Sequence, residues 1–396
     1  MEGKRLIEKI RLRNILSFGE KIIEKKSSSS MDMQKLLEYY KQGEEIELQP
    51  LNVIIGQNAS GKSNFIDVIR LLHSLPENKG LVNFISKSGG ISEWLWKGKK
   101  SNANAIIETE FKWLDGVVKY EIEFTEKNQR LFIENEKFFN VNGVELFDRK
   151  SIFEPMDGEE SLLSNSSLSF FSSKAEFIFF RNILLKMVGI YTDLQTSRNS
   201  DIRGMQFADL PNDFLDEDGE NLSLVLNSLE SYYDTKAKII ENLKKFYPKI
   251  ENYTVRILGG SVQLYIHEEN LKKPISAKRL SDGTLRYLCL LAILCHPEPP
   301  PLICIEEPET GLHPDILPTI AELMKDAATR TQLIVTTHSD ILVSAFSDMP
   351  EAVLVCEKDE DGTHFKRLEA DKLKSWLDEY SLGDLWLKGE IGGTRW

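Results

Sequence analysis

The residues best suited to chemistry form a phosphate-binding pattern, Gly-Gln-Asn-Ala-Ser-Gly-Lys-Ser at positions 56–63. An apolar run precedes it at 51–55, and apolar residues at helical spacing follow it at 64–72, so the pattern joins a predicted strand to a predicted helix. In that setting glycines let backbone N–H groups approach a phosphate, and the helix N-terminus adds partial positive charge. A glycine-rich turn that merely fits the pattern is the alternative, and the flanking elements disfavour it.

This loop predicts how a nucleoside triphosphate would be held. Lys62 would reach the β- and γ-phosphates, and the Ser63 hydroxyl would hold Mg²⁺. The predicted nucleotide-binding residues of the loop are Gly56, Asn58, Ala59, Ser60, Gly61, Lys62, Ser63 and Asn64.

Two adjacent acids follow another apolar run, 302–305, which is typical of a buried parallel strand. Acids at that point would lie at the carboxyl edge of the sheet, where ligands bind in α/β folds. Glu306 would hold Mg²⁺ through its water shell, and Glu307 would orient and deprotonate an attacking water. A surface turn is the alternative, and the apolar strand before the acids disfavours it.

His338 also follows an apolar run, at 332–335, and would donate a hydrogen bond to the γ-phosphate. A lone histidine is more often structural. Its place at the expected end of a strand favours the functional interpretation.

A second possible anion site begins the helix predicted at 285–295, which is apolar on nearly every face and is therefore expected to be buried. Ser281 and Gly283 offer a hydroxyl and an unhindered backbone there, whereas Asp282 cannot face a phosphate. The alternative is that Ser281 only caps the helix, and this segment taken alone favours the cap.

The remaining chain divides into regular segments. Alternating residues predict an antiparallel meander at 105–113, 117–124 and 130–139, and a hairpin at 253–258 and 262–267. Helical spacing predicts one long helix at 222–246 and a short helix at 31–42 in an otherwise flexible loop.

Composition excludes several classes of protein. The chain has 396 residues and a net charge of −13, which disfavours broad binding to nucleic acid or anionic lipid. No apolar run approaches the roughly 18 residues of a membrane span, and no signal peptide is evident, so we expect a cytoplasmic protein without a membrane partner. Four cysteines without metal-ligand spacing are expected to be buried, reduced thiols: Cys289, Cys295, Cys304 and Cys356.

One segment, 94–100, offers a local nucleic-acid site because Trp94 and Trp96 lie beside three lysines, Lys97, Lys99 and Lys100. An exposed turn whose tryptophans pack inward is the commoner arrangement, and we favour it.

The order of these motifs resembles that of ABC-type ATPases of the RecF/SMC-like branch. The motifs are the phosphate loop, a long insertion, Leu-Ser-Asp-Gly-Thr at 280–284, Ile-Glu-Glu-Pro-Glu at 305–309 and Thr-His-Ser at 337–339. Within that branch the sequence looks closest to the stand-alone or effector-paired ATPases related to the OLD family of prokaryotic defence and repair. The resemblance implies an α/β P-loop fold: an ABC-type head with a mixed central sheet, an antiparallel β subdomain and a helical insertion, or lid.

The resemblance also implies a homodimer in which ATP lies between Lys62 of one subunit and Ser281, Asp282 and Gly283 of the other. It makes Glu307 the catalytic base and His338 the switch histidine, with ATP and Mg²⁺ as the bound groups. Glu306 stands where aspartate is commoner, and Asp282 replaces a usual glycine; both departures bear on turnover more than on binding.

The expected domain organisation has four parts. They are an ATPase core with the antiparallel β subdomain at 1–140, an insertion at 141–275, the rest of the core at 276–368 and a tail at 369–396. The expected function is ATP hydrolysis whose nucleotide state is passed to DNA or to a separate effector protein. The alternative is an ATP-gated scaffold that hardly turns ATP over and holds a toxin or nuclease.

Overall fold

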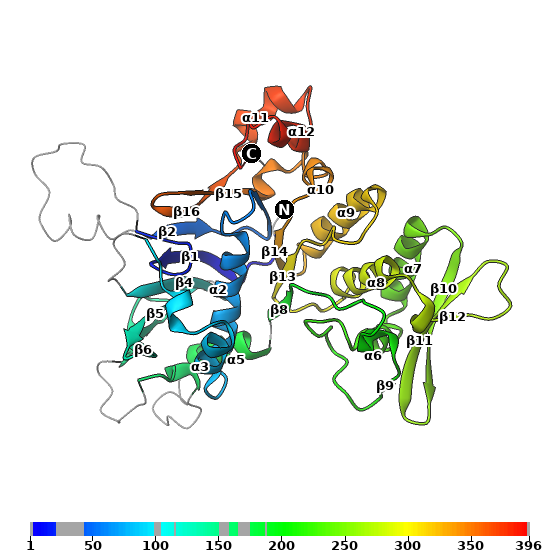
Figure 1. Ribbon diagram of the computed structural model, residues 1–396, viewed down its shortest axis with the longest axis horizontal. Coiled ribbons are helices and arrows are strands. Elements are labelled where there is room, and N and C mark those ends of the chain that lie inside the picture. Colours follow the sequence, from blue (N-terminus) through cyan, green and yellow to red (C-terminus); the bar gives the residue numbers. More distant parts are fainter. Residues whose placement is uncertain are drawn as a thin grey trace, which may run out of the picture.

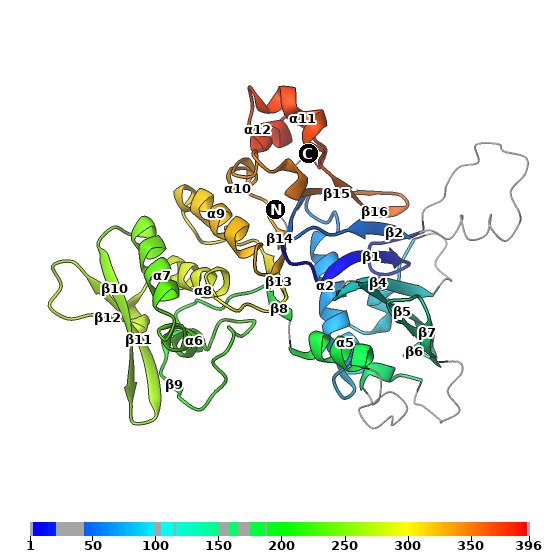
Figure 2. The same ribbon diagram turned by 180° about the vertical axis from the view of Figure 1, so that it is seen from behind.

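The computed structural model describes residues 3–20, 43–98, 104–114, 116–149, 158–164, 175–186 and 188–393. The helix expected at 31–42 lies outside these residues. Two lobes flank a central sheet, and the C-terminal helices lie together beyond one end of that sheet (Figure 1; Figure 2 shows the reverse side).

The central sheet carries the segments that the sequence predicted as parallel strands. Its strands are β3 (Leu51–Gly56), β8 (Val188–Tyr191), β13 (Leu302–Glu306), β14 (Gln332–Thr336), β15 (Val353–Asp359) and β16 (Gly362–Arg367). Their order is β16-β15-β3-β14-β13-β8, and all neighbours are parallel except β15 and β16, which form an antiparallel hairpin. The predicted mixed sheet is therefore confirmed, and the apolar runs of β3, β13 and β14 are buried, as expected of strands covered on both faces.

One lobe is built on an antiparallel sheet of order β2-β1-β4-β5-β6-β7. Its strands are β1 (Ile7–Arg13), β2 (Glu44–Glu47), β4 (Ala105–Trp113), β5 (Gly116–Lys127), β6 (Arg130–Phe139) and β7 (Glu145–Asp148). The predicted meander is confirmed in β4, β5 and β6. Helix α2 (Lys62–Ser74) shares one apolar core with this sheet and one face of the central sheet. The short helices of this lobe are α3 (Gly80–Lys87), α4 (Ile91–Trp94), η2 (Leu162–Ser164) and α5 (Ala175–Lys186).

The other lobe packs around α8 (Asp282–Leu294), which is buried along most of its length as predicted. Its other elements are η3 (Asp201–Arg203), β9 (Gln206–Phe207), α6 (Leu222–Leu229), α7 (Tyr233–Phe246), β10 (Ile250–Leu258), β11 (Ser261–Glu268), β12 (Ile275–Ser276) and η4 (Ala277–Arg279). The predicted hairpin is confirmed in β10 and β11.

The single helix predicted at 222–246 is wrong. The chain leaves α6 after Leu229, and Tyr232 has extended backbone before α7 begins. The two shorter helices both pack against α8. Helical periodicity did not reveal it because both halves carry the same apolar spacing.

The second face of the central sheet shares its apolar core with α8 and with the helices that follow β13, β14 and β16. These are η5 (Pro314–Ile316), α9 (Leu317–Ala327), α10 (Asp340–Ser344), η6 (Pro350–Ala352), α11 (Ala370–Leu377) and α12 (Leu382–Leu387). Their apolar side chains and those of β3, β13 and β14 form a second core. The tail contains α11 and α12, and α12 packs on α10.

The four predicted parts of the chain remain predictions. Two strands of the segment 141–275 belong elsewhere in the fold, since β7 extends the antiparallel sheet and β8 forms an edge of the central sheet. Within the part of the chain that the structure describes, no helix is long and apolar enough to cross a membrane.

The proposed nucleic-acid segment packs largely inward. Trp94 is 2% exposed and its ring lies 5.4 Å from that of Phe84, while Lys97 pairs with Glu93. Lys99 and Lys100 lie outside the described residues. Trp94 therefore has no open face on which a base could stack.

Candidate functional site

The phosphate loop runs from the end of β3 to the start of α2 and is held in a conformation that requires glycine. Gly61 has φ 113°, and a Cβ there would lie 2.3 Å from Thr363 Oγ1 and 2.6 Å from Ser17 Oγ. A Cβ on Gly56 would lie 2.2 Å from the Cys356 carbonyl oxygen. The loop is thus pressed against β15 and β16, and its two glycines allow this approach.

Ser60 connects the loop to this hairpin and presents a polar atom without a partner. Its carbonyl oxygen lies 2.7 Å from Thr363 Oγ1 and 3.5 Å from the sulfur of Cys356. Its hydroxyl is buried and, among the described residues, makes no hydrogen bond. A buried hydroxyl in a glycine-rich loop at a helix start suits an oxyanion ligand.

The Lys62 ammonium lies across the same loop. Its Nζ donates to the carbonyl oxygens of Gly56 at 3.0 Å and Gln57 at 2.8 Å, and the residue is 6% exposed. Burial lowers the pKa of Lys62, and the nearby carboxylates of Glu306 and Glu307 oppose that shift. The cation is therefore held inside the loop, where phosphate oxygens would be the natural partners for it.

The two predicted metal ligands lie near each other. The Ser63 hydroxyl in the first turn of α2 is close enough to the carboxyl group of Glu306, at the end of β13, to lower the pKa of that group. Burial raises the pKa of Glu306, and the nearby Ser63 hydroxyl partly offsets this effect. A hydroxyl and a carboxylate side by side are the hard oxygen ligands that Mg²⁺ prefers.

Glu307 and His338 lie at the ends of adjacent strands. Glu307 has φ 43°, its N–H donates to the carbonyl oxygen of Thr336 at 3.0 Å, and its carboxylate is half exposed. His338 Nε2 lies 3.6 Å from Glu307 Oε1, and Thr310 Oγ1 lies 3.3 Å from Glu307 Oε2. The positive φ turns the chain sharply after β13, so that this carboxylate faces the loop after β14.

Glu309 was not among the predicted site residues, yet it joins these two loops. Its Oε1 accepts hydrogen bonds from Thr337 Oγ1 and from the His338 N–H, both at 2.7 Å. Its Oε2 is buried without a partner among the described residues, and burial raises the pKa of this carboxyl group. The sequence did contain a signal for this role, because Glu309 is the third acid after the apolar run at 302–305.

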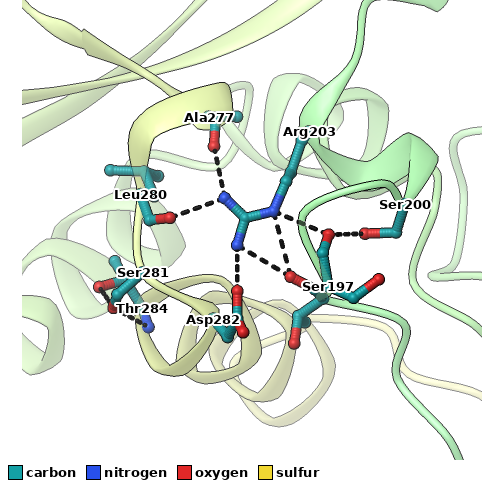
Figure 3. Close-up of polar contacts among 9 residues, drawn as sticks. Ser197, Ser200, Arg203, Ala277, Leu280, Ser281, Asp282 and Thr284 are labelled. Carbon is teal, nitrogen blue, oxygen red and sulfur yellow. Dashed lines mark hydrogen bonds and ion pairs between the residues drawn. The ribbon is translucent and has the colours of Figure 1, made fainter.

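The residues of the second predicted anion site, Ser281 to Gly283, lie at the start of α8. Ser281 Oγ accepts from the Thr284 N–H at 3.0 Å, so it does cap the helix, and it lies 2.7 Å from Thr284 Oγ1. A Cβ on Gly283 would be 2.9 Å from the Gly311 carbonyl oxygen, in the loop after β13. Figure 3 shows the Asp282 carboxylate turned toward Arg203, with which it forms an ion pair.

A cavity of about 610 Å³ borders the outer side of the phosphate loop. Its lining residues are Gln57, Asn58, Ala59, Ser60, Cys356, Glu357, Lys358, Asp359, His364 and Gly393. Gly393 reaches it from the tail: its N–H donates to Glu357 Oε1 at 2.8 Å, and its carbonyl oxygen accepts from the Trp386 indole at 2.6 Å. Sequence reasoning did not place the tail beside this loop.

Solved structures of SMC head domains are similar to this chain in fold. One is described as an Smc head bound to the C-winged helix domain of ScpA; it shares 16% identity and a TM-score of 0.58, over 93% of this chain and 99% of that one. A Pyrococcus furiosus Smc head with an extended coiled coil, bound to the C-terminal domain of ScpA, shares 14% identity and a TM-score of 0.56, over 94% of this chain and 99% of that one. A Pyrococcus yayanosii Smc head with a coiled coil and joint shares 12% identity and a TM-score of 0.51, over 94% of this chain and 99% of that one. The likeness confirms the predicted ABC-type head fold.

A family model matches residues 51–344, which include the phosphate loop, the acidic pair and His338. Its description reads "AAA domain, putative AbiEii toxin, Type IV TA system". The placement beside the OLD family stays a prediction. Because the match spans more than half of the chain, the protein belongs to this family of AAA domains.

Proposed function

We propose that this protein is an ATPase that converts ATP and water to ADP and phosphate. The observation that carries the proposal is the meeting of three elements at one edge of the central sheet. Lys62 lies within the phosphate loop, Ser63 lies near Glu306, and His338 lies 3.6 Å from Glu307. These are the cradle, metal ligands, base and γ-phosphate partner that phosphoanhydride hydrolysis needs.

The phosphates of ATP would lie on the backbone N–H groups of the loop, with Lys62 turning from the loop carbonyls to the β- and γ-oxygens. The Ser60 hydroxyl, which has no hydrogen-bond partner in the described part of the chain, and the Gly61 conformation support this arrangement. The adenosine part would lie in the cavity of about 610 Å³ that is lined by the loop and by the end of β15. Asn58, Ala59 and Ser60 line it.

Ser63 and Glu306 would hold Mg²⁺, which when bound supplies positive charge to the phosphate oxygens. Glu307 takes a proton from a water whose oxygen bonds to the γ-phosphorus, as the bond to the β–γ bridging oxygen breaks and ADP leaves. His338 donates a hydrogen bond to the γ-phosphate, and Glu309 fixes the backbone that carries it.

The reaction is proposed to need two copies of the chain. The start of α8 on a second copy, with its Ser281, Asp282 and Gly283, would close over the γ-phosphate as a second helix N-terminus. Closing and opening of this homodimer would pass the nucleotide state to an effector protein or to nucleic acid. A cytoplasmic role in antiviral defence or DNA repair is the corresponding proposal, supported by the family description and the resemblance to OLD-related ATPases.

A second candidate is an ATP-gated scaffold with little turnover that holds a toxin or nuclease. It is favoured by the contact of Gly393 with the cavity, because a bound nucleotide and the tail would then share a wall. Rapid ATP turnover by the isolated protein would contradict it.

The decisive measurement is phosphate release from ATP and Mg²⁺ by the wild type, Lys62→Ala and Glu307→Gln. We expect each substitution to reduce the rate at least 100-fold, Lys62→Ala through binding and Glu307→Gln through chemistry. Exposed residues of α11 and its C-terminal flank give matched controls, Lys374→Ala and Glu379→Gln, which should retain the wild-type rate. Equal rates in all five proteins would end the proposal.

A further inference from the structure

Arg203 is a buried arginine that ties a distant segment to the start of α8. It ends η3 and is 5% exposed. Its guanidinium donates to five groups (Figure 3), namely the carbonyl oxygens of Thr196 (2.9 and 3.1 Å), Ser197 (2.9 Å), Leu280 (2.7 Å) and Ala277 (3.4 Å), and the carboxylate of Asp282.

The pairing with Asp282 is what balances the charge of Arg203. A guanidinium stays protonated in proteins, and burying it without an anion is strongly unfavourable. Carbonyl oxygens satisfy its N–H groups but carry no net charge. The side chain of Arg203 is 6% exposed and that of Asp282 is 64% exposed, so the cation lies inside the lobe and the anion at its surface.

The same pairing changes the electrostatics of the helix start. Asp282 is the acidic residue in the first turn of α8, and a free carboxylate there would repel a phosphate that approaches the helix N-terminus. Arg203 cancels that charge and turns the carboxylate away from Ser281 and Thr284. The hydroxyl pair and the helix dipole are then the groups that face an incoming anion.

We propose that Arg203 is a positioning residue that makes the start of α8 able to accept the γ-phosphate of ATP held by a second copy of the chain. The inference rests on the proposed function. The new element is that Arg203, in the segment 196–204, compensates the charge of Asp282. Arg203 also fixes the backbone of Ala277 and Leu280.

The test measures ATP-dependent dimerisation by sedimentation in the Glu307→Gln background, which keeps ATP intact. Asp282→Asn leaves the positive charge of Arg203 uncompensated, and we expect it to tighten the ATP-dependent dimer about fivefold to tenfold. Arg203→Gln leaves Asp282 bare and should weaken the dimer at least tenfold. The double variant should return toward the parent affinity, whereas a role in packing alone would leave it as weak as Arg203→Gln.

Three further measurements sharpen this design. Binding of a fluorescent ATP analogue at monomer concentrations should be unchanged in every variant, because the phosphate loop is intact. In about 1 M salt, where the Debye length is about 3 Å, the gain from Asp282→Asn should fall below about twofold. Asp371→Asn, in the first turn of α11, is the matched control and should have no effect on dimerisation.

The outcomes separate the two levels of the proposal. If the parent stays monomeric with ATP, the proposed ATP sandwich fails and this inference falls with it. If the parent dimerises but Asp282→Asn does not tighten the dimer, the inference alone is overturned. Asp282→Asn keeps an amide oxygen that can accept from Arg203, and a urea unfolding curve checks that this variant folds, so its result stands even where Arg203→Gln fails to fold.

Discussion

Helices α2 and α8 both begin at proposed phosphate sites, yet each obtains its positive charge differently. The first turn of α2 contains Lys62 and no acid. The first turn of α8 contains an acid, Asp282, whose counter-charge is Arg203, 79 positions away in the chain. The first site is therefore complete within one short segment, whereas the second depends on the tertiary fold.

The two sites also differ in how their loops are held. The phosphate loop fits against the hairpin of β15 and β16 so closely that neither Gly56 nor Gly61 has room for a Cβ. The segment before α8 is held by one guanidinium, that of Arg203, which donates to the carbonyl oxygens of Ala277 and Leu280. A substitution that adds bulk should therefore damage the phosphate loop most, whereas a substitution that changes charge should damage the start of α8 most.

The largest effect is expected for Gly61→Ala. The backbone at φ 113° strains any L-residue, and the new Cβ would meet Thr363 Oγ1 and Ser17 Oγ at 2.3 and 2.6 Å. We expect a loss of about 3 kcal/mol in the free energy of unfolding and at least 100-fold weaker ATP binding. Urea unfolding measures the loss of stability, and titration with a fluorescent nucleotide measures the loss of binding.

Gly283→Ala is the matched change at α8. Its Cβ would lie 2.9 Å from one backbone oxygen, that of Gly311, without a positive φ. The expected loss is about 1 kcal/mol, with ATP binding by the monomer unchanged and dimerisation weakened. Equal loss of nucleotide binding in the two variants would contradict the division between the sites.

The next largest effect concerns Glu309, which connects the two strand ends near the γ-phosphate. Glu309→Ala leaves the Thr337 hydroxyl and the His338 N–H without their acceptor, so His338 should lose its fixed position. We expect kcat to fall about 10-fold to 100-fold with little change in KM. Steady-state phosphate release measures both constants.

Glu309→Gln provides the control because the amide oxygen can still accept both hydrogen bonds. It should lose less than about threefold in kcat. If Gln and Ala were equally impaired, the carboxylate charge rather than the two hydrogen bonds would be what matters.

Local patterns predicted the parts of the site that are close in sequence. The strand, loop and helix at 51–74 follow from apolar spacing and two glycines, and Glu306, Glu307 and His338 from acids and a histidine at strand ends. Thr363 and Gly393 reach the phosphate loop from remote segments, Arg203 reaches the start of α8 from another, and no local spacing signals such contacts. The break between α6 and α7 was missed for a related reason: packing on α8 decides it, not the periodicity.

A smaller effect is expected for Thr363→Val, which keeps the shape of the side chain and removes its hydroxyl. The Ser60 carbonyl and the Ser17 hydroxyl would each lose a contact of 2.7 Å behind the phosphate loop. We expect a loss of about 1 to 2 kcal/mol in the free energy of unfolding and ATP binding about threefold weaker. Thr363→Ser retains the hydroxyl and should bind ATP like the wild type; a weakened Thr363→Ser would point to the methyl group instead.

The smallest effect lies at the far wall of the same cavity, where His364 contacts two carboxylates. Its Nδ1 is 3.0 Å from Glu44 Oε2 and its Nε2 is 3.0 Å from Asp359 Oδ1. The hydrogen bond to Glu44 raises the pKa of His364 above its ordinary value of 6.5, against the opposing effect of burial. A raised folded-state pKa adds stability that is complete below about pH 6.5 and is lost as the pH rises through the folded-state value.

His364→Gln should therefore destabilise the protein most in acid and least in alkali. We expect a difference of about 0.5 to 1 kcal/mol near pH 6, because the pair is partly exposed, and a smaller difference at pH 9. Urea unfolding of both proteins across this range measures it. A difference that grew with pH would mean that neutral His364 is the stabilising form. This wall of the cavity would then carry only the negative charges of Glu44 and Asp359, opposite in sign to the charge of Lys62 within the loop.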